Sequence, residues 1–91
     1  MNELEFSFEL ISQDEEARLG KIYTSRGVVD TPAFMPVGTL GTVKGVFTED
    51  LLSTETQIIL GNTYHLMIRP GTNTLDLFGG LHKYMNWPNP I

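Results

Sequence analysis

The side chains with the clearest chemical potential follow the apolar run at residues 58–60, where Asn62, Tyr64 and His65 come after a glycine. The amide of Asn62 combines a donor with an acceptor and could orient a ligand or a neighbouring carboxylate. An asparagine here could equally cap a helix or turn the chain, and the sequence leaves both interpretations open. Histidine is a common acid–base catalyst, but the position of His65 favours a structural or interface role.

A second candidate is the loop at residues 38–45, which contains three glycines and Lys44. A phosphate-binding P-loop has its lysine directly after the last glycine, followed by serine or threonine. Here Gly45 follows Lys44, and the spaced glycines of a dinucleotide-binding loop are absent as well. Residues 38–41 match the short glycine motif of KH domains, but the chain is too acidic for that role. The pattern favours glycines that only permit a tight turn.

The acidic residues form no pair suited to acid–base catalysis. Glu49 and Asp50 fall where a helix is predicted to begin, Asp76 stands alone, and the other acids lie in polar strands or turns. His82 follows two glycines and is predicted to be structural or exposed. Because the chain has two histidines and no cysteine, we expect no self-contained metal site within it. Taken together, these candidates form no complete catalytic set, and we expect no cofactor in this chain.

Composition excludes further classes of protein. A formal net charge of -5 argues against this chain alone holding a nucleic-acid backbone. No apolar stretch is long enough to cross a bilayer, and acidic residues stand where a signal peptide would be basic. We therefore expect a cytoplasmic protein without membrane contact.

Residues 1–32 are predicted to form an antiparallel β ribbon. At its start, apolar residues alternate with polar ones, which predicts a strand with one buried face: Leu4, Phe6, Phe8 and Leu10. A polar turn is expected at residues 12–16, then a second strand with a bulge at Gly20. Pro32 limits a third extended segment.

Residues 33–91 are predicted to contain two βα units. Residues 34–37 and 58–60 are apolar without alternation, which is typical of parallel strands covered on both faces. Thr48 is expected to cap the helix after the first strand, with Phe47 and Leu52 forming a hydrophobic staple. Near the end of the chain, Trp87 is expected to pack where the chain re-enters the sheet.

This order of elements has two consequences. Loops that leave the carboxyl ends of parallel strands form the active face in such folds, so residues 38–41 and 61–63 are expected to lie there. Parallel strands with two apolar faces also need neighbours on both sides. We therefore expect the chain by itself to fold poorly or to aggregate.

Four segments are specific enough to point to a family: TPAFMPVGT (31–39), TVKG (42–45), IILGNTYHLMIRPG (58–71) and FGGLHKYMNW (78–87). They closely resemble the amino-terminal part of bacterial tRNA-guanine transglycosylases, also called queuine tRNA-ribosyltransferases. The resemblance extends over residues 6–91. Its most specific parts are IILGNTYHL and FGGLH.

The resemblance implies a fold and a reaction. Family members are irregular TIM barrels preceded by an antiparallel sheet. The expected fold class is therefore α/β, with the ribbon followed by the first βαβα part of such a barrel, incomplete in this chain. Members exchange guanine at the tRNA wobble position for a 7-deazaguanine-type queuine precursor, through a covalent aspartyl–ribose intermediate. The complete enzyme is expected to act on tRNA as a homodimer.

The resemblance implies roles for particular residues that match the family's motifs. By motif position, Asn62 resembles the family's asparagine beside the catalytic aspartate, and it is expected to support the active face. Five other residues match positions near the homodimer contact and form the expected dimer rim: Thr39, Lys44, His65, Leu66 and Pro70.

The resemblance also implies which parts are missing. In the family, the segment matching residues 86–91 continues into Leu-Thr-Asp-Ser-Gly-Gly-Phe, which contains the acid–base aspartate. The nucleophilic aspartate and the ligands of one structural zinc, three cysteines and a histidine, follow beyond Ile91. We expect an amino-terminal segment that is inactive alone. The alternative is a non-catalytic interaction module that pairs with a full-length subunit through the dimer rim.

Overall fold

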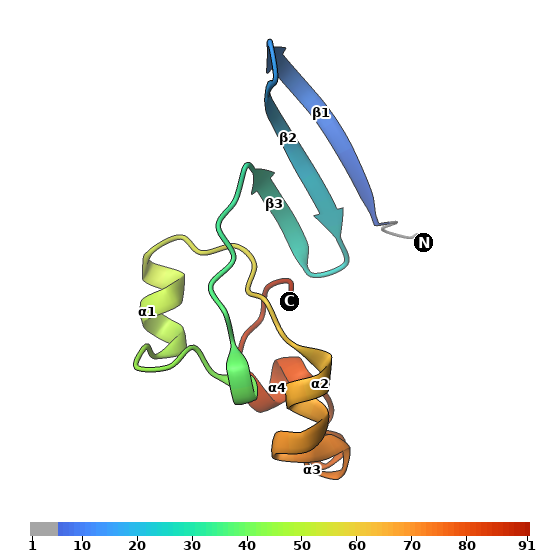
Figure 1. The fold of residues 1–91 in the computed structure, drawn as a ribbon, viewed down its shortest axis with the longest axis vertical. Coiled ribbons are helices and arrows are strands. Elements are labelled where there is room, and N and C mark those ends of the chain that lie inside the picture. Colours follow the sequence, from blue (N-terminus) through green and yellow to red (C-terminus); the bar gives the residue numbers. More distant parts are fainter. Residues whose placement is uncertain (1–5) are drawn as a thin grey trace.

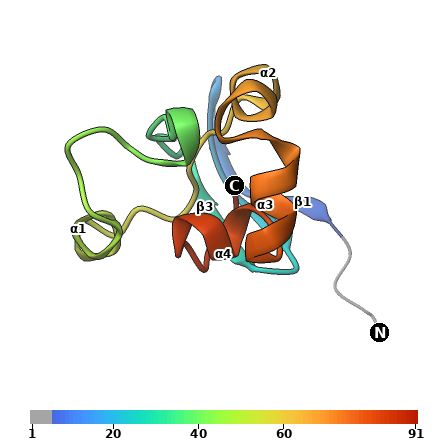
Figure 2. The same ribbon diagram turned by 90° about the horizontal axis from the view of Figure 1, so that it is seen from below.

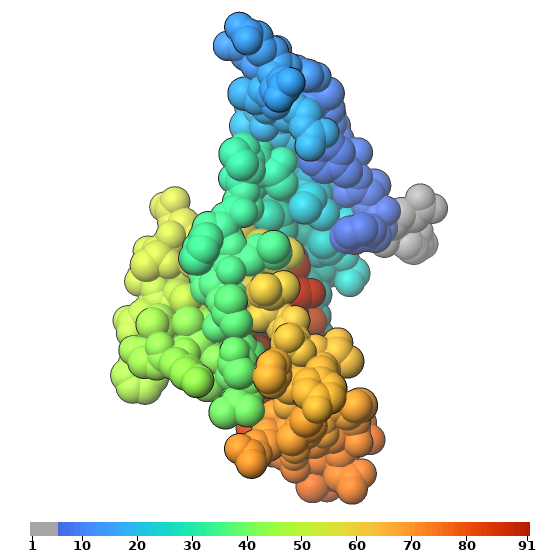
Figure 3. All heavy atoms as spheres, viewed as in Figure 1, coloured from blue at the N-terminus to red at the C-terminus, as the bar shows by residue number. Residues whose placement is uncertain are grey.

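The computed structural model describes residues 6–91, and their elements form a β ribbon and a helical part (Figure 1). The ribbon has three strands: β1 (Ser7–Asp14), β2 (Ala17–Thr24) and β3 (Gly27–Thr31). The helical part comprises the short turn η1 (Thr39–Gly41), α1 (Thr48–Ser53), α2 (Thr63–Leu66), the wide turn η2 (Met67–Gly71), α3 (Thr72–Phe78) and α4 (Leu81–Met85). The ribbon projects from the helical part (Figure 3), within overall extents of 45 × 34 × 24 Å.

The predicted ribbon is confirmed as an antiparallel sheet in the order β1-β2-β3. Its first turn is shorter than expected, because β1 extends to Asp14 and only two residues form the turn. The predicted bulge exists, but it lies in β1, where the register shifts between Leu10 and Ser12. Gly20 pairs with Leu10 at this point. Leu4 lies outside the described residues.

Gly20 is required by the ring of Phe8. A Cβ at Gly20 would lie 2.6 Å from Cζ of Phe8 and 2.8 Å from the carbonyl oxygen of Glu9. Phe8 pairs with Ile22 across the ladder, so its ring reaches diagonally over the glycine. The ring of Phe8 in the neighbouring strand therefore occupies the space that a side chain at position 20 would need.

The expected buried face of the first strand is not found. Every residue of β1 is exposed, and Phe8 keeps 50% of its surface accessible. In the ribbon, burial concentrates on Val29 of β3, which is fully buried. The reason is position: β3 leads into the helical part, whereas β1 is the outer strand, with no element over it (Figure 1).

The two predicted parallel strands shorten to a single parallel bridge between Val37 and Leu60. The N–H of Leu60 donates to Pro36 O at 2.8 Å, and the N–H of Gly38 donates to Leu60 O at 2.7 Å. Two-sided burial was wrong for most of these residues, since Phe34 is 83% and Leu60 44% exposed. The described residues form an α/β mixture whose regular sheet is the antiparallel ribbon.

The core of the helical part surrounds Trp87. Leu51, Ile59 and Trp87 form a buried cluster, against which Met85 and other partly buried side chains pack. Trp87 is only 1% exposed, and its Nε1 donates to Pro90 O at 3.0 Å. The predicted packing of this aromatic is confirmed. The cluster connects α1, on one side of the helical part, with the segment that follows α4 (Figure 2).

Helix α1 begins differently from the prediction. Thr48 is its first residue, and Phe47 occupies the cap position without a side-chain hydrogen bond. The hydroxyl of Thr48 instead donates to Met85 O at 3.2 Å, which ties α1 to α4. Phe47 is 73% exposed, so the expected staple with Leu52 is not formed. The first turn does carry its two acidic residues, as the helix dipole favours.

Candidate functional site

The loop after Val37 folds into η1, whose glycines allow close packing. Gly38 and Gly41 are buried, and Gly41 has a φ of +76°. A Cβ on Gly41 would lie 2.6 Å from the ring of Tyr84 in α4. The backbone of this turn therefore contacts α4 directly. This agrees with the prediction that these glycines permit a tight turn.

Asn62 caps helix α2. Its Oδ1 accepts a hydrogen bond from His65 N–H at 3.2 Å, and its carbonyl accepts one from Leu66 N–H at 2.9 Å. Of the two interpretations left open by the sequence, the structure shows the cap. The cap uses only the acceptor of the amide, and the side chain of Asn62 is exposed.

The predicted dimer-rim positions lie mainly on adjoining elements, because η1 contacts both α2 and η2. Thr39 is in η1, His65 and Leu66 are in α2, and Pro70 is in η2. Lys44 lies in an exposed turn beyond η1. Leu66 is only 7% exposed, so its side chain supports the interior, whereas His65 is exposed.

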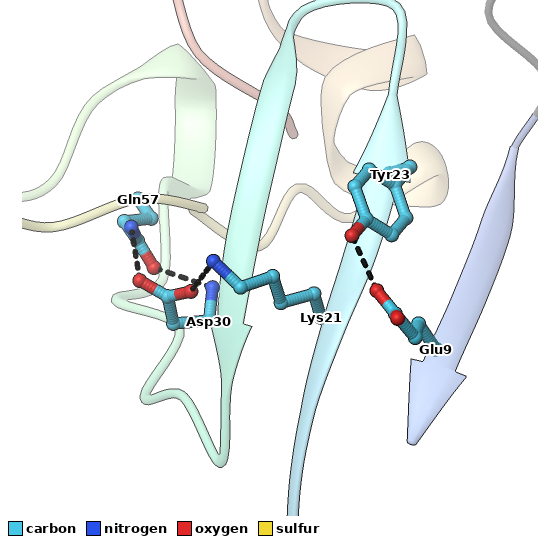
Figure 4. Close-up of polar contacts among 5 residues, drawn as sticks. All are labelled: Glu9, Lys21, Tyr23, Asp30 and Gln57. Carbon is cyan, nitrogen blue, oxygen red and sulfur yellow. Dashed lines mark hydrogen bonds and ion pairs between the residues drawn. The ribbon is translucent and has the colours of Figure 1, made fainter. Parts of the chain in front are cut away.

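A contact between Asp30 of the ribbon and Gln57, in the segment that follows α1, was not predicted from the sequence. The amide oxygen of Gln57 accepts a hydrogen bond from Asp30 N–H at 2.7 Å, and its Nε2 donates to the Asp30 carboxylate at 3.2 Å (Figure 4). Lys21 pairs with the same carboxylate at 3.3 Å. The hydrogen bond from Gln57, followed by Lys21, lowers the pKa of Asp30. The partners are 27 residues apart, so no local pattern indicates the pair.

A second polar contact stabilises the ribbon itself. The hydroxyl of Tyr23 in β2 donates to Glu9 Oε1 in β1 at 2.5 Å (Figure 4). This hydrogen bond is the main reason why the pKa of Tyr23 is raised. Both polar contacts of Figure 4 are structural: neither brings together an acid, a base and a nucleophile.

The described residues contain neither a cluster of metal ligands nor a helix that could span a membrane. Within residues 6–91, no three histidine, aspartate or glutamate side chains gather where they could hold a metal ion. The chain has no cysteine, and the zinc ligands that the resemblance implies are expected beyond Ile91. Among the same residues, no helix combines the length and apolar character needed to cross a membrane.

Comparison with known proteins identifies the family. The family model described as queuine tRNA-ribosyltransferase matches residues 13–91. The chain belongs to this family. The queuine tRNA-ribosyltransferase of Hydrogenovibrio crunogenus is 58% identical over 84 residues, which are 92% of this chain and 23% of that protein. Those of Pseudoalteromonas translucida and Aquifex aeolicus are each 56% identical, over 92% and 94% of this chain.

The family match confirms the resemblance seen in the sequence. It includes most of the ribbon and all of the helical part, with Asn62 and the dimer-rim positions. The chain spans 22–23% of the length of these queuine tRNA-ribosyltransferases. The tests below use a chimeric protein. It consists of this chain followed by the part of the Hydrogenovibrio protein that comes after its matched residues, and it is named the joined enzyme.

His82 is a half-buried histidine of the queuine tRNA-ribosyltransferase segment that the sequence did not single out for function. Its Nε2 is buried and has no hydrogen-bond partner among the described residues. His82 lines a cavity of about 390 Å³ together with Arg26, Glu49 and Lys83. Burial, and then the positive charge of Arg26, lowers the pKa of His82 below its usual 6.5.

This histidine predicts a loss of stability in acid. The unfolded chain takes up the His82 proton first, so stability should fall as the pH drops below about 6.5, the unfolded value. His82→Gln should reduce this fall, because glutamine does not titrate. The melting temperature of the joined enzyme, measured at about pH 7.5 and about pH 5 with and without the substitution, tests this. An equal fall in both proteins would contradict it.

Proposed function

We propose that this chain is the amino-terminal part of a tRNA-guanine transglycosylase, which exchanges guanine at the tRNA wobble position for a 7-deazaguanine-type queuine precursor. One observation carries the proposal: 58% identity over 92% of this chain to a queuine tRNA-ribosyltransferase of which the chain spans only 23%. In this function the chain contributes supporting residues, and the catalytic aspartates lie beyond Ile91.

The path of the chain near its end supports a role for Asn62. The N–H of Ile59 donates to Pro90 O at 3.2 Å, and Ile91 lies close to Gly61, with its Cγ2 3.4 Å from where a Cβ would be. The last residues therefore run beside residues 59–61 in the same direction. A polypeptide continuing along this path approaches Asn62, whose amide donor is not used by the helix cap. In the proposed enzyme, this donor orients the acid–base aspartate.

Base exchange tests the proposed function. The chain alone, incubated with tRNA and labelled guanine, is expected to incorporate no label above the blank, because it lacks the nucleophile and the acid–base group. The joined enzyme is expected to incorporate label. Incorporation by the chain alone would disprove its inactivity, and a soluble, folded joined enzyme without exchange would disprove the assignment.

We further propose a second role, as a non-catalytic module that pairs with a full-length subunit. The observation that favours it is that α2, which carries exposed His65, contacts both η1, which contains Thr39, and η2, which contains Pro70. If this role holds, the tagged chain co-purifies with a full-length Hydrogenovibrio enzyme at micromolar concentration, and His65→Asp weakens the pairing. Failure of the wild-type chain to co-purify removes this role.

A further inference from the structure

Gln57 attaches the ribbon to the segment that leads to Asn62. Both ends of its amide bind one residue of β3: Oε1 accepts from Asp30 N–H at 2.7 Å, and Nε2 donates to the Asp30 carboxylate at 3.2 Å (Figure 4). Lys21 of β2 binds the other oxygen of that carboxylate at 3.3 Å. Among residues 6–91, the two bonds of Gln57 are the only hydrogen bonds between the three strands and the helical part.

The segment from Gln57 to Asn62 contains neither helix nor turn, so its course depends on the contacts that hold it. Leu60 forms the parallel bridge, and Ile59 N–H donates to Pro90 O directly beside it. Both of these contacts lie toward the Asn62 end. Contacts at one end fix the place of a segment but leave its direction free. The hydrogen bonds of Gln57 to β3 hold the other end and so fix the direction.

We propose that Gln57 is a positioning residue: by binding Asp30, it fixes the direction in which residues 57–61 approach Asn62. The inference rests on the proposed function, in which the amide donor of Asn62 orients the acid–base aspartate. Because Asn62 follows the segment directly and caps α2, a change of direction moves the cap and the donor together. A misplacement of about 1 Å can slow catalysis by up to about a hundredfold.

Gln57→Glu in the joined enzyme disrupts the contact with little change in size. The new carboxylate can still accept from Asp30 N–H, but it has no N–H to donate, and it repels the Asp30 carboxylate. We expect kcat for the exchange of labelled guanine to fall about fivefold or more, because the acid–base group is held less well. KM for tRNA should stay within about twofold, since the donor of Asn62 orients a protein group and does not bind the substrate. A raised KM with unchanged kcat would overturn the proposal.

Adding Asp30→Asn to Gln57→Glu should rescue kcat. The hydrogen bond then runs in the opposite direction, because the new amide at position 30 donates to the new carboxylate at position 57. We expect kcat to return to within about twofold of the value for the unsubstituted joined enzyme. A folded double variant without recovery would show that this contact does not position Asn62.

Tyr23→Phe is the matched control. It removes the other contact of Figure 4, the hydrogen bond to Glu9, which also joins exposed side chains of the ribbon. This contact involves no residue of the segment at 57–62, so kcat is expected to remain unchanged. If Tyr23→Phe lowered kcat as much as Gln57→Glu does, general weakening of the ribbon would explain both losses, and the assignment of Gln57 would fail.

A double-mutant cycle with Asn62→Asp separates positioning from support of the fold. Aspartate keeps the acceptor that caps α2 but lacks the amide donor, so Asn62→Asp should itself lower kcat. Gln57→Glu should then add no further loss, since the donor that it positions is gone. Additive losses in kcat would overturn the proposal, and so would an unchanged kcat in Asn62→Asp.

The remaining outcomes distinguish this inference from the proposed function. An active joined enzyme in which Gln57→Glu leaves kcat unchanged overturns the positioning role and leaves the proposed function standing. A folded joined enzyme without exchange contradicts the proposed function itself. If Gln57→Glu does not fold, Gln57→Met replaces it, because methionine removes both hydrogen bonds without adding a charge. Failure of both variants to fold shows a general structural role and overturns the inference.

Discussion

Trp87→Ala is expected to lower the unfolding free energy of the joined enzyme by about 3–5 kcal/mol, as for other large buried aromatics. Trp87 is 1% exposed and fills the centre of the core with Leu51 and Ile59. Alanine would leave a cavity where three segments of the chain meet. It would also leave Pro90 O without the hydrogen bond from Nε1. Denaturant titration of the wild-type and variant proteins measures the loss.

Two controls separate packing from the hydrogen bond. Trp87→Phe keeps most of the apolar volume and removes only the indole N–H, so it should cost clearly less than alanine. Leu77→Ala should change stability by less than about 0.5 kcal/mol, since Leu77 is 86% exposed. If Trp87→Ala lowers the unfolding free energy no more than Leu77→Ala does, Trp87 is not the centre of the core.

The ribbon could be predicted from the sequence because its signals are local. Polar residues at each turn and Pro32 after the third strand indicate the three strands without knowledge of distant contacts. The burial of these strands could not be predicted in the same way. Alternation around Phe8 shows that one face is apolar, but whether that face is covered depends on elements elsewhere in the chain.

The parallel units were harder to predict, because their partners are distant in sequence. Residues 34–37 and 58–60 pair through one bridge only, although both runs have the composition of buried strands. Thr48 has the chemistry of a cap, yet its hydroxyl bonds to Met85, a residue 37 positions away. Local propensity gives way here to a tertiary hydrogen bond.

In the candidate site too, local features could be predicted from the sequence and long-range contacts could not. The cap by Asn62 was one of two local interpretations, and its bond spans three residues. The Gln57–Asp30 contact and the buried Nε2 of His82 depend on how the ribbon lies against the helical part. Neither has a sequence signature. The family came from long, specific segments, which identify a relative without revealing the contacts that hold its fold together.

The second large effect is expected at Gly20, where alanine should destabilise the joined enzyme by about 1–3 kcal/mol. The backbone of Gly20 is not in a left-handed conformation, so the cost comes from space alone. A Cβ would lie 2.6 Å from Cζ of Phe8 and 2.8 Å from Glu9 O. The ring can rotate away only by giving up its contact with β2, and the carbonyl belongs to the β1–β2 ladder.

A matched control and a double variant make the Gly20 prediction specific. Gly61→Ala should be nearly neutral, because its Cβ would meet side-chain atoms no closer than 3.4 Å, an ordinary contact. Adding Phe8→Ala to Gly20→Ala should recover part of the loss, since the ring clash disappears and only the carbonyl contact remains. Thermal melting of the four proteins measures this coupling. If the two substitutions were strictly additive, the ring of Phe8 would not be what requires a glycine at position 20.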